Sequence, residues 1–384
     1  MDVDELLLDD PDALIAADTR QLLVITASAG ASMRASAERI DQDAVARIVA
    51  DGRPSSVVVV GGGGSRIAGD ILAAVAGSKS PVLIAAVGGP ALPGWVGPTD
   101  LVVAVSAGGT TPETLEVANE AARRGCRLMG VCPSASRLGE VLERTRSAER
   151  FDVGIPPTGE VWQSRTLMWS LATPLLLVGG ALGLVEDAQA AVTNAATALD
   201  DIADRCSPYR DSVTNLAKQW ALDATFSLPM LWGSGDIGAV AVRRFGRQLA
   251  ANAGLPAVVG TLPEAARTQS VLLAGPRAGA SSNLDDIFRD RVDDPDSDPR
   301  LRLVLLRDAD EHPRTAALAD AAEEVALIRG VPTSVLRAAP GHPLGRLATL
   351  AGTTDFVSVY AALALGSDPM ASANELDGIA GFTG

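Results

Sequence analysis

Residues 55–70 read SSVVVVGGGGSRIAGD, and this stretch decides the fold class. Val57 to Val60 form an unbroken run of β-branched residues, which is typical of a strand buried on both faces of a parallel sheet. The glycines that follow end the strand, and residues 67–77 have the composition of a helix. A buried strand, a glycine loop and a helix predict the first unit of an α/β domain.

The same alternation recurs along the chain. Further strands are predicted in the first half at 81–87, 100–106 and 126–132. In the second half a strand, a glycine loop and a helix are predicted again at 228–254, with more strands at 256–260, 301–308 and 333–339. We therefore predict an α/β fold with two doubly wound parallel sheets, each in a three-layer, flavodoxin-like αβα arrangement.

The predicted organisation has three parts. Residues 1–155 comprise N-terminal helices and the first domain, 156–225 form a helical connection, and 226–384 form the second domain with a C-terminal helix. A chain of 384 residues is long enough for two domains, since one domain takes roughly 150 residues.

Composition narrows the classes of function. The chain holds 47 acidic and 32 basic residues, a net charge of −15, and only 3% aromatic residues, which argues against nucleic-acid binding. His312 and His342 are the only two histidines, so a zinc site built on several histidines is excluded and no metal is predicted. Cys126, Cys132 and Cys206 lack paired spacing and are expected to be reduced core residues of a cytoplasmic protein.

One apolar run, residues 166–185, is long enough to cross a bilayer. It contains Pro174 and three glycines, and no basic cluster flanks it. The N-terminal sequence MDVDELLLDDPD is acidic, whereas a signal peptide begins with positive charge. We therefore expect a helix buried in a domain or at a subunit interface, and no membrane association.

Two loops in the first half have the composition of anion sites. Gly61 to Gly64 and Ser65 lie between a strand and a helix, where backbone N–H groups and the helix dipole favour an anion. Residues 106–111, SAGGTT, occupy the next such junction and add hydroxyl donors from Ser106 and Thr111. The alternative interpretations are a tight turn for the glycines and an ordinary N-cap for Thr111.

A third loop, Gly233 to Gly238, fits the dinucleotide pattern GxGxxG after a strand. No acidic residue closes the following strand near 258–260, so the usual partner of a ribose hydroxyl is missing. Binding of NAD at this loop stays open as an alternative, and the favoured interpretation needs no cofactor.

Five motifs together resemble the bifunctional phosphoglucose/phosphomannose isomerases, which consist of two sugar isomerase (SIS) domains. VVVVGGGGSRIAGD is similar to the family block GMGGSGIAGD, and VAVSAGGTTPETL to the phosphate loop SYSGNTEET. Gln163-Ser164-Arg165 resembles a QPR signature. Residues 231–249 resemble the start of the family's second domain, and 350–369 its C-terminal helix.

The resemblance implies a cytoplasmic homodimer that binds a phosphorylated hexose. It assigns the phosphate cradle to five residues, Gly63, Gly64, Ser65, Ser106 and Thr111. It also matches Arg165 to the arginine that stabilises the enediolate of the isomerisation.

Departures from the family pattern fall on its acid/base groups. Where the family has ENAK, with the glutamate as base, this chain has Ala251 at the glutamate position. Where the family has PELNHNE, with the ring-opening histidine, this chain has Arg267. No lysine follows Lys218, so the family's C-terminal lysine has no counterpart.

Two hypotheses follow from these departures. In the first, the protein binds a hexose phosphate without isomerising it efficiently. In the second, it is an active aldose–ketose isomerase that uses relocated acid/base groups. Glu264, Asp236 and His342 are the conceivable substitutes, and Glu264 and His342 are the candidates beside Arg165.

Overall fold

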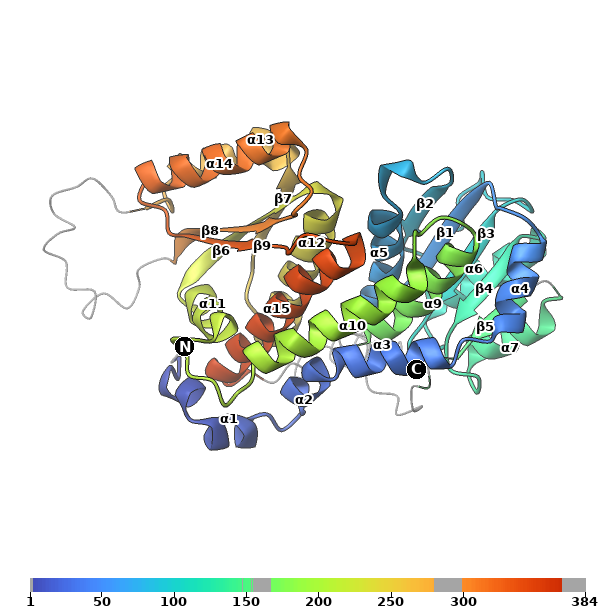
Figure 1. The fold of residues 1–384 in the computed structure, drawn as a ribbon, viewed down its shortest axis with the longest axis horizontal. Coiled ribbons are helices and arrows are strands. Elements are labelled where there is room, and N and C mark those ends of the chain that lie inside the picture. The colour runs from blue at the N-terminus through green and yellow to red at the C-terminus, as the bar shows by residue number, and fades with distance from the viewer. Residues whose placement is uncertain (1–2, 147, 153, 155–166, 280–298, 368–384) are drawn as a thin grey trace, which may run out of the picture. The chain divides into compact units, whose positions relative to one another are not determined.

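The computed structural model describes residues 3–146, 148–152, 154, 167–279 and 299–367 (Figure 1). These residues form two compact units. The N-terminal unit comprises the described residues of 25–201, and the C-terminal unit combines 3–24 with the described residues of 202–367. Arg165 and the QPR-like signature lie outside the described residues.

The N-terminal unit is built on a parallel sheet in the order β2-β1-β3-β4-β5. Its strands are β1 (Ser56–Gly61), β2 (Leu83–Val87), β3 (Leu101–Val105), β4 (Arg127–Val131) and β5 (Ala148–Phe151). The central strand β1 is buried along its whole length, and its Val58 pairs with Ala85 of β2 and Val102 of β3. The valine run therefore forms the strand that its composition predicts.

Helices cover both faces of this sheet. They are α3 (Ala29–Glu38), α4 (Gln42–Ala50), α5 (Ile67–Ala76), α6 (Pro112–Arg123), α7 (Arg137–Arg144) and α9 (Met168–Ala181), with single turns η2 (Gly63–Arg66) and η3 (Gly77–Lys79). Helices α6 and α7 enclose one core with Val58 and Val102. On the other face, Gly69 of α5 lies against Val59 and Ala86, where a Cβ atom would clash.

The C-terminal unit is built on a second parallel sheet, in the order β7-β6-β8-β9. Its strands are β6 (Ser227–Ser234), β7 (Val258–Leu262), β8 (Arg300–Arg307) and β9 (Thr333–Arg337). Its helices are η1 (Leu6–Asp9), α1 (Pro11–Ala17), α11 (Leu216–Thr225), α12 (Gly235–Ala253), α13 (Glu264–Thr268), η4 (Ser270–Ala274), α14 (Pro313–Ile328) and α15 (Pro343–Ala364). Two further helices cross the division between the units, α2 (Leu22–Ala27) and α10 (Ala188–Arg205).

Both sheets share one winding order. In each sheet the first strand lies between the second and the third. The connection from the first strand to the second therefore runs to one side, and the connection from the second strand to the third crosses back to the other side. This arrangement opens a crevice at the carboxyl ends of the first and third strands, where doubly wound folds bind ligands. The predicted fold class is confirmed, and the strand order places the two switch points at β1/β3 and at β6/β8. The domain boundaries at 155 and 225 stay a prediction.

The apolar run of the sequence becomes α9, which lies in the interior of the N-terminal unit. Trp169, Leu171 and Leu176 are among its fully buried side chains, and Pro174 lies inside the helix. Among the described residues, α15 is the single helix with the length and hydropathy to cross a membrane, and most of it is buried within the fold. Burial on all sides accounts for the apolar composition of both helices.

Candidate functional site

The crevice of the N-terminal sheet is formed by two loops that touch. One runs from Gly61, the last residue of β1, into η2, and the other connects β3 to α6. A Cβ atom on Gly62 would lie 2.9 Å from Cγ2 of Thr111, and one on Gly61 would lie 3.0 Å from the carbonyl oxygen of Val105. The glycines at these two positions therefore permit the close approach of the loops.

The hydroxyl groups of the second loop meet at this point. Oγ of Ser106 and Oγ1 of Thr111 lie 3.0 Å apart. Thr111 occupies the N-cap position of α6, yet within the described part of the chain its side chain makes no capping hydrogen bond. The amide groups of the first turn of α6 thus lack a capping side chain, beside a pair of hydroxyls. Thr111 is therefore the N-cap residue of α6, as the sequence predicts, but its side chain does not cap the helix.

The first loop adds further donors. Ser65 is 3% exposed, and Gly63 has a positive φ of 49° with no atom within 4 Å of where its Cβ would lie. Gly63 therefore faces open space rather than packed side chains. The backbone amides of Ser65 and Ile67 already donate to the carbonyl oxygens of Gly62 and Ser65, so the glycine residues that precede them are the candidates for contacting an anion at this edge of the sheet.

Thr114, in the first turn of α6, is a residue that the sequence analysis missed. It is 1% exposed, and its Oγ1 is buried without a hydrogen-bond partner among the residues that the structure describes. A buried hydroxyl without a partner costs about 1–3 kcal/mol unless something binds it. The motif TPET contained this threonine, but nothing in its spacing marked it as different from a core residue.

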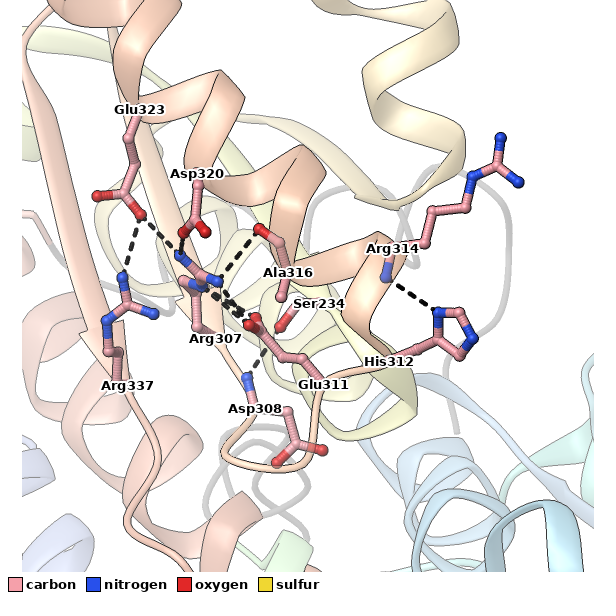
Figure 2. Close-up of polar contacts among 10 residues, drawn as sticks. All are labelled: Ser234, Arg307, Asp308, Glu311, His312, Arg314, Ala316, Asp320, Glu323 and Arg337. Carbon is pink, nitrogen blue, oxygen red and sulfur yellow. Dashed lines mark hydrogen bonds and ion pairs between the residues drawn. The ribbon is translucent and has the colours of Figure 1, made fainter.

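The corresponding crevice of the C-terminal sheet has the opposite chemistry (Figure 2). Its loop after β8 reads DADEH, where the first sheet has SAGGTT. The Arg307 guanidinium, 3% exposed, lies 2.5 Å from Oε2 of Glu311, 2.5 Å from Oδ1 of Asp320 and 3.0 Å from Oε1 of Glu323. Figure 2 shows Glu311 reaching Arg307 from the loop, while the other two carboxylates come from α14.

The electrostatics of this loop follow from these partners. Burial pushes the pKa of Glu311 up, but hydrogen bonds from Arg307 and Ser234 outweigh it and hold that pKa below its ordinary value. Asp308 differs, because burial raises its pKa although Arg346, 2.7 Å away, opposes the rise. The backbone amide of Asp308 donates to Oγ of Ser234 at 2.9 Å. Carboxylates of the chain itself thus lie at the carboxyl end of β8, around Arg307 and Arg346.

The glycines of the GxGxxG pattern are explained by packing. A Cβ on Gly233 would collide with the carbonyl oxygen of Gly238, and one on Gly238 would lie 2.7 Å from the carbonyl oxygen of Leu306. Oδ2 of Asp308 lies 3.6 Å from where a Cβ of Gly235 would be. An acidic side chain beside the loop would repel a pyrophosphate, so the geometry argues against a dinucleotide here.

Comparison with known proteins agrees with the motifs. The model of the bacterial phospho-glucose isomerase C-terminal SIS domain matches residues 213–374. Over 315 residues the chain is 27% identical to a bifunctional phosphoglucose/phosphomannose isomerase of Caldicellulosiruptor bescii, covering 82% of this chain and 85% of that protein. Residues 213–374 thus match a SIS domain, and most of the chain is similar to a bifunctional phosphoglucose/phosphomannose isomerase.

Solved structures show the same fold at low identity. The C-terminal domain of glucosamine-fructose-6-phosphate aminotransferase from Francisella tularensis has a TM-score of 0.63 at 13% identity, covering 91% of this chain and 97% of that chain. Tagatose-6-phosphate ketose/aldose isomerase from Escherichia coli has a TM-score of 0.61 at 14% identity, covering 88% and 92%. These similarities establish the fold.

Ala251 and Arg267, which differ from the acid/base pattern of the resembling family, occupy different places in this protein. Ala251 lies in the last turn of α12, about 24 Å along the helix from the carboxyl edge of its own sheet. Its neighbour Asn252 is buried and donates to Oγ of Ser358 at 3.0 Å. Arg267 lies on α13, with its Nη1 3.8 Å from Oε2 of Glu264.

The candidate substitutes, Glu264 and His342, follow different strands. Glu264 begins α13 after β7 and its side chain is 66% exposed, whereas His342 lies after β9 and its Nδ1 accepts the backbone amide of Leu344 at 3.1 Å. Strands β7 and β9 are the two outer strands of the sheet. Their carboxyl ends are separated by three strand spacings, about 14 Å, so the structure does not bring the two residues together.

The cysteines and the possible metal ligands provide no further candidate site. Cys126, Cys132 and Cys206 are buried and free, and burial raises the pKa of Cys132 to about 11 and that of Cys206 to about 12. Such thiols are not nucleophiles at neutral pH. Among the described residues no group of three or more metal-ligating side chains could hold an ion.

Proposed function

We propose that this protein binds a phosphorylated hexose at the carboxyl ends of β1 and β3. The phosphate would lie against Gly63, Gly64 and Ser65 on one side and Ser106 and Thr111 on the other. The single observation that carries the proposal is the Thr111 hydroxyl, which faces Ser106 at 3.0 Å instead of capping α6. Hydroxyls and uncapped amides at helix N-termini suit an anionic ester without a metal or cofactor.

We further propose that the bound sugar is isomerised slowly or not at all. Ala251 has no group that can accept the C2 proton, and Arg267 stays protonated at working pH. A positioned acid or base contributes about 10²–10⁴-fold to such a reaction, so losing two removes most of the rate. The role would then be to sense or deliver a hexose phosphate in the cytoplasm, as a homodimer.

Isothermal titration calorimetry on the full chain tests binding. Glucose 6-phosphate, mannose 6-phosphate and fructose 6-phosphate are titrated beside glucose, which lacks the phosphate. We expect at least one ester to bind more than about 10-fold tighter than glucose, because hydrogen bonds to a charged group contribute about 1.5–3 kcal/mol. Equal binding of glucose and its ester, or no binding of any ester, would refute the proposal.

A second candidate function is an active aldose–ketose isomerase. The observation in its favour is the 27% identity over most of the chain to a bifunctional phosphoglucose/phosphomannose isomerase. Arg165 would stabilise the enediolate, and Glu264 or His342 would move the proton. A coupled assay with the three hexose phosphates tests it: turnover that falls at least 100-fold in Glu264→Ala or His342→Ala, with unchanged ester affinity, would favour this candidate.

A further inference from the structure

Arg66 stands at the phosphate loop where the family block GMGGSGIAGD has glycine. It ends η2 and occupies the N-cap position of α5, directly after Ser65. Its backbone nitrogen lies 3.0 Å from where a Cβ of Gly61 would be, so its main chain is part of the turn that closes β1. A long cationic side chain has therefore been added to a loop otherwise made of small, uncharged residues.

The Arg66 side chain lies over the carboxyl end of β2, beside β1. Its Nη2 donates to the carbonyl oxygen of Ala86 at 3.3 Å. Its Cδ and Nη1 lie 3.7 and 3.8 Å from where a Cβ of Gly88 would be. Because β2 and β1 are neighbours in register, this position is at the same edge of the sheet as the glycine loop. The guanidinium is thus held near the cradle by one long hydrogen bond.

Among the described residues, one hydrogen bond from the Arg66 side chain is seen. A guanidinium carries five N–H donors, and Nε of Arg66 is buried without a hydrogen-bond partner in the described part of the chain. The described residues also place no carboxylate within ion-pair distance of it. Arg307 shows the contrast, since three carboxylates surround its guanidinium. A partly buried cation with an unpaired donor at an anion cradle has the properties of a ligand-binding group.

We propose that Arg66 donates charge-assisted hydrogen bonds to the phosphate of the bound ester and makes the site selective for dianionic phosphate monoesters. The proposal rests on the proposed function and adds a phosphate-binding residue, Arg66, at a position where the family block has glycine. Hydroxyls and amides alone tolerate any small anion, whereas a planar guanidinium pairs with two phosphate oxygens at once. Arg66 would therefore provide both affinity and discrimination by charge.

The test compares Arg66→Gln and Arg66→Lys with Arg53→Gln. Arg53 is exposed and precedes β1, so it lies at the amino end of the same strand and its replacement changes the net charge equally. Calorimetry measures the affinity of each full-length variant for a hexose 6-phosphate and for inorganic phosphate. We expect Arg66→Gln to bind both at least about 10-fold more weakly and Arg53→Gln to stay within about 2-fold of the wild type.

The lysine variant separates charge from geometry. Lysine retains the positive charge but cannot form the forked pair, so we expect an affinity between those of the wild type and the glutamine variant. Thermal unfolding without ligand checks that the variants fold. If Arg66→Gln does not fold, an Arg66→Lys affinity equal to that of the wild type would overturn the forked contact.

The outcomes distinguish this inference from the function on which it rests. Wild-type affinity in Arg66→Gln, with hexose phosphate still bound, would overturn the role of Arg66 and leave the cradle intact. Failure of the wild-type protein to bind any phosphate ester would remove the proposed function and this inference together. Selective weakening in Arg66→Gln, with a normal Arg53→Gln control, supports both.

Discussion

At the scale of single residues, the contact between Thr111 and Ser106 separates a binding role from a structural one. A threonine in the N-cap position normally accepts a backbone amide, and removing that bond destabilises a helix by about 1 kcal/mol. Here the hydroxyl points to Ser106 instead. Ser136, the N-cap of α7, provides the ordinary case, because its Oγ accepts the amide of Gly139 at 3.1 Å.

We therefore expect Thr111→Val to weaken binding of hexose phosphate by about 10-fold while changing the free energy of unfolding by less than about 0.5 kcal/mol. The matched control, Ser136→Ala, should lose about 1 kcal/mol of stability and keep its affinity. Calorimetry and urea unfolding measure the two quantities. A Thr111→Val protein that is less stable but binds normally would return this residue to a capping role.

Glu311 gives a second prediction at this scale. Its folded-state pKa lies below the ordinary value of 4.5, so the stability that it contributes is present above that pH and is lost as the pH falls through the lowered pKa. Glu311→Gln removes the charge beside the buried Arg307. We expect the variant to be less stable than the wild type at pH 7, with the difference shrinking towards pH 3. Urea unfolding at both pH values measures the difference in stability. A difference that grows in acid would contradict a lowered pKa for Glu311.

At the scale of elements, helices α12 and α15 are joined by a buried ion pair. Nε of Arg244 lies 2.7 Å from Oδ1 of Asp355, and Nη2 lies 2.8 Å from Oδ2, with the two side chains 5% and 7% exposed. Both helices are largely apolar around this pair. A paired charge in such surroundings fixes how the helices align, since each partner is costly to bury alone.

Asp355→Asn should destabilise the C-terminal unit by about 3–5 kcal/mol, because it leaves Arg244 buried without its counter-charge. The double replacement Arg244→Met with Asp355→Leu should recover most of the loss. Asp200→Asn is the exposed control, where the ion pair with Arg34 is 42% and 44% exposed and the change should stay below about 1 kcal/mol. Equal losses of stability in Asp355→Asn and Asp200→Asn would argue against a special role of the buried ion pair in aligning α12 and α15.

The sequence predicted elements better than contacts. The valine run before Gly61 and the apolar strand at 301–308 have no plausible place except the centre of a parallel sheet, and both are there. The apolar run at 166–185, which the sequence analysis expected to form a buried helix, contains the buried helix Met168–Ala181. In contrast, the orientation of the Thr111 hydroxyl and the filling of the second crevice by Glu311 depend on rotamers and on residues brought together by topology, which periodicity does not encode.

At the scale of the whole molecule, one chain contains two sheets of the same winding order with unlike edges. The first edge presents hydroxyls and amides, and the second presents carboxylates around Arg307. We expect one hexose phosphate per chain. Native mass spectrometry counts bound ligands directly, and two equivalent sites per chain would show that the carboxylates of the second crevice move aside.

The division into two compact units, each with its own core, has a calorimetric consequence. A ligand stabilises only the part of a protein that holds it, by about 2.7 kcal/mol at a hundred times its dissociation constant. In differential scanning calorimetry, we expect the sugar ester to raise the unfolding temperature of the N-terminal unit and to leave that of the C-terminal unit unchanged. The unfolding temperature of the C-terminal unit would then not depend on the concentration of hexose phosphate.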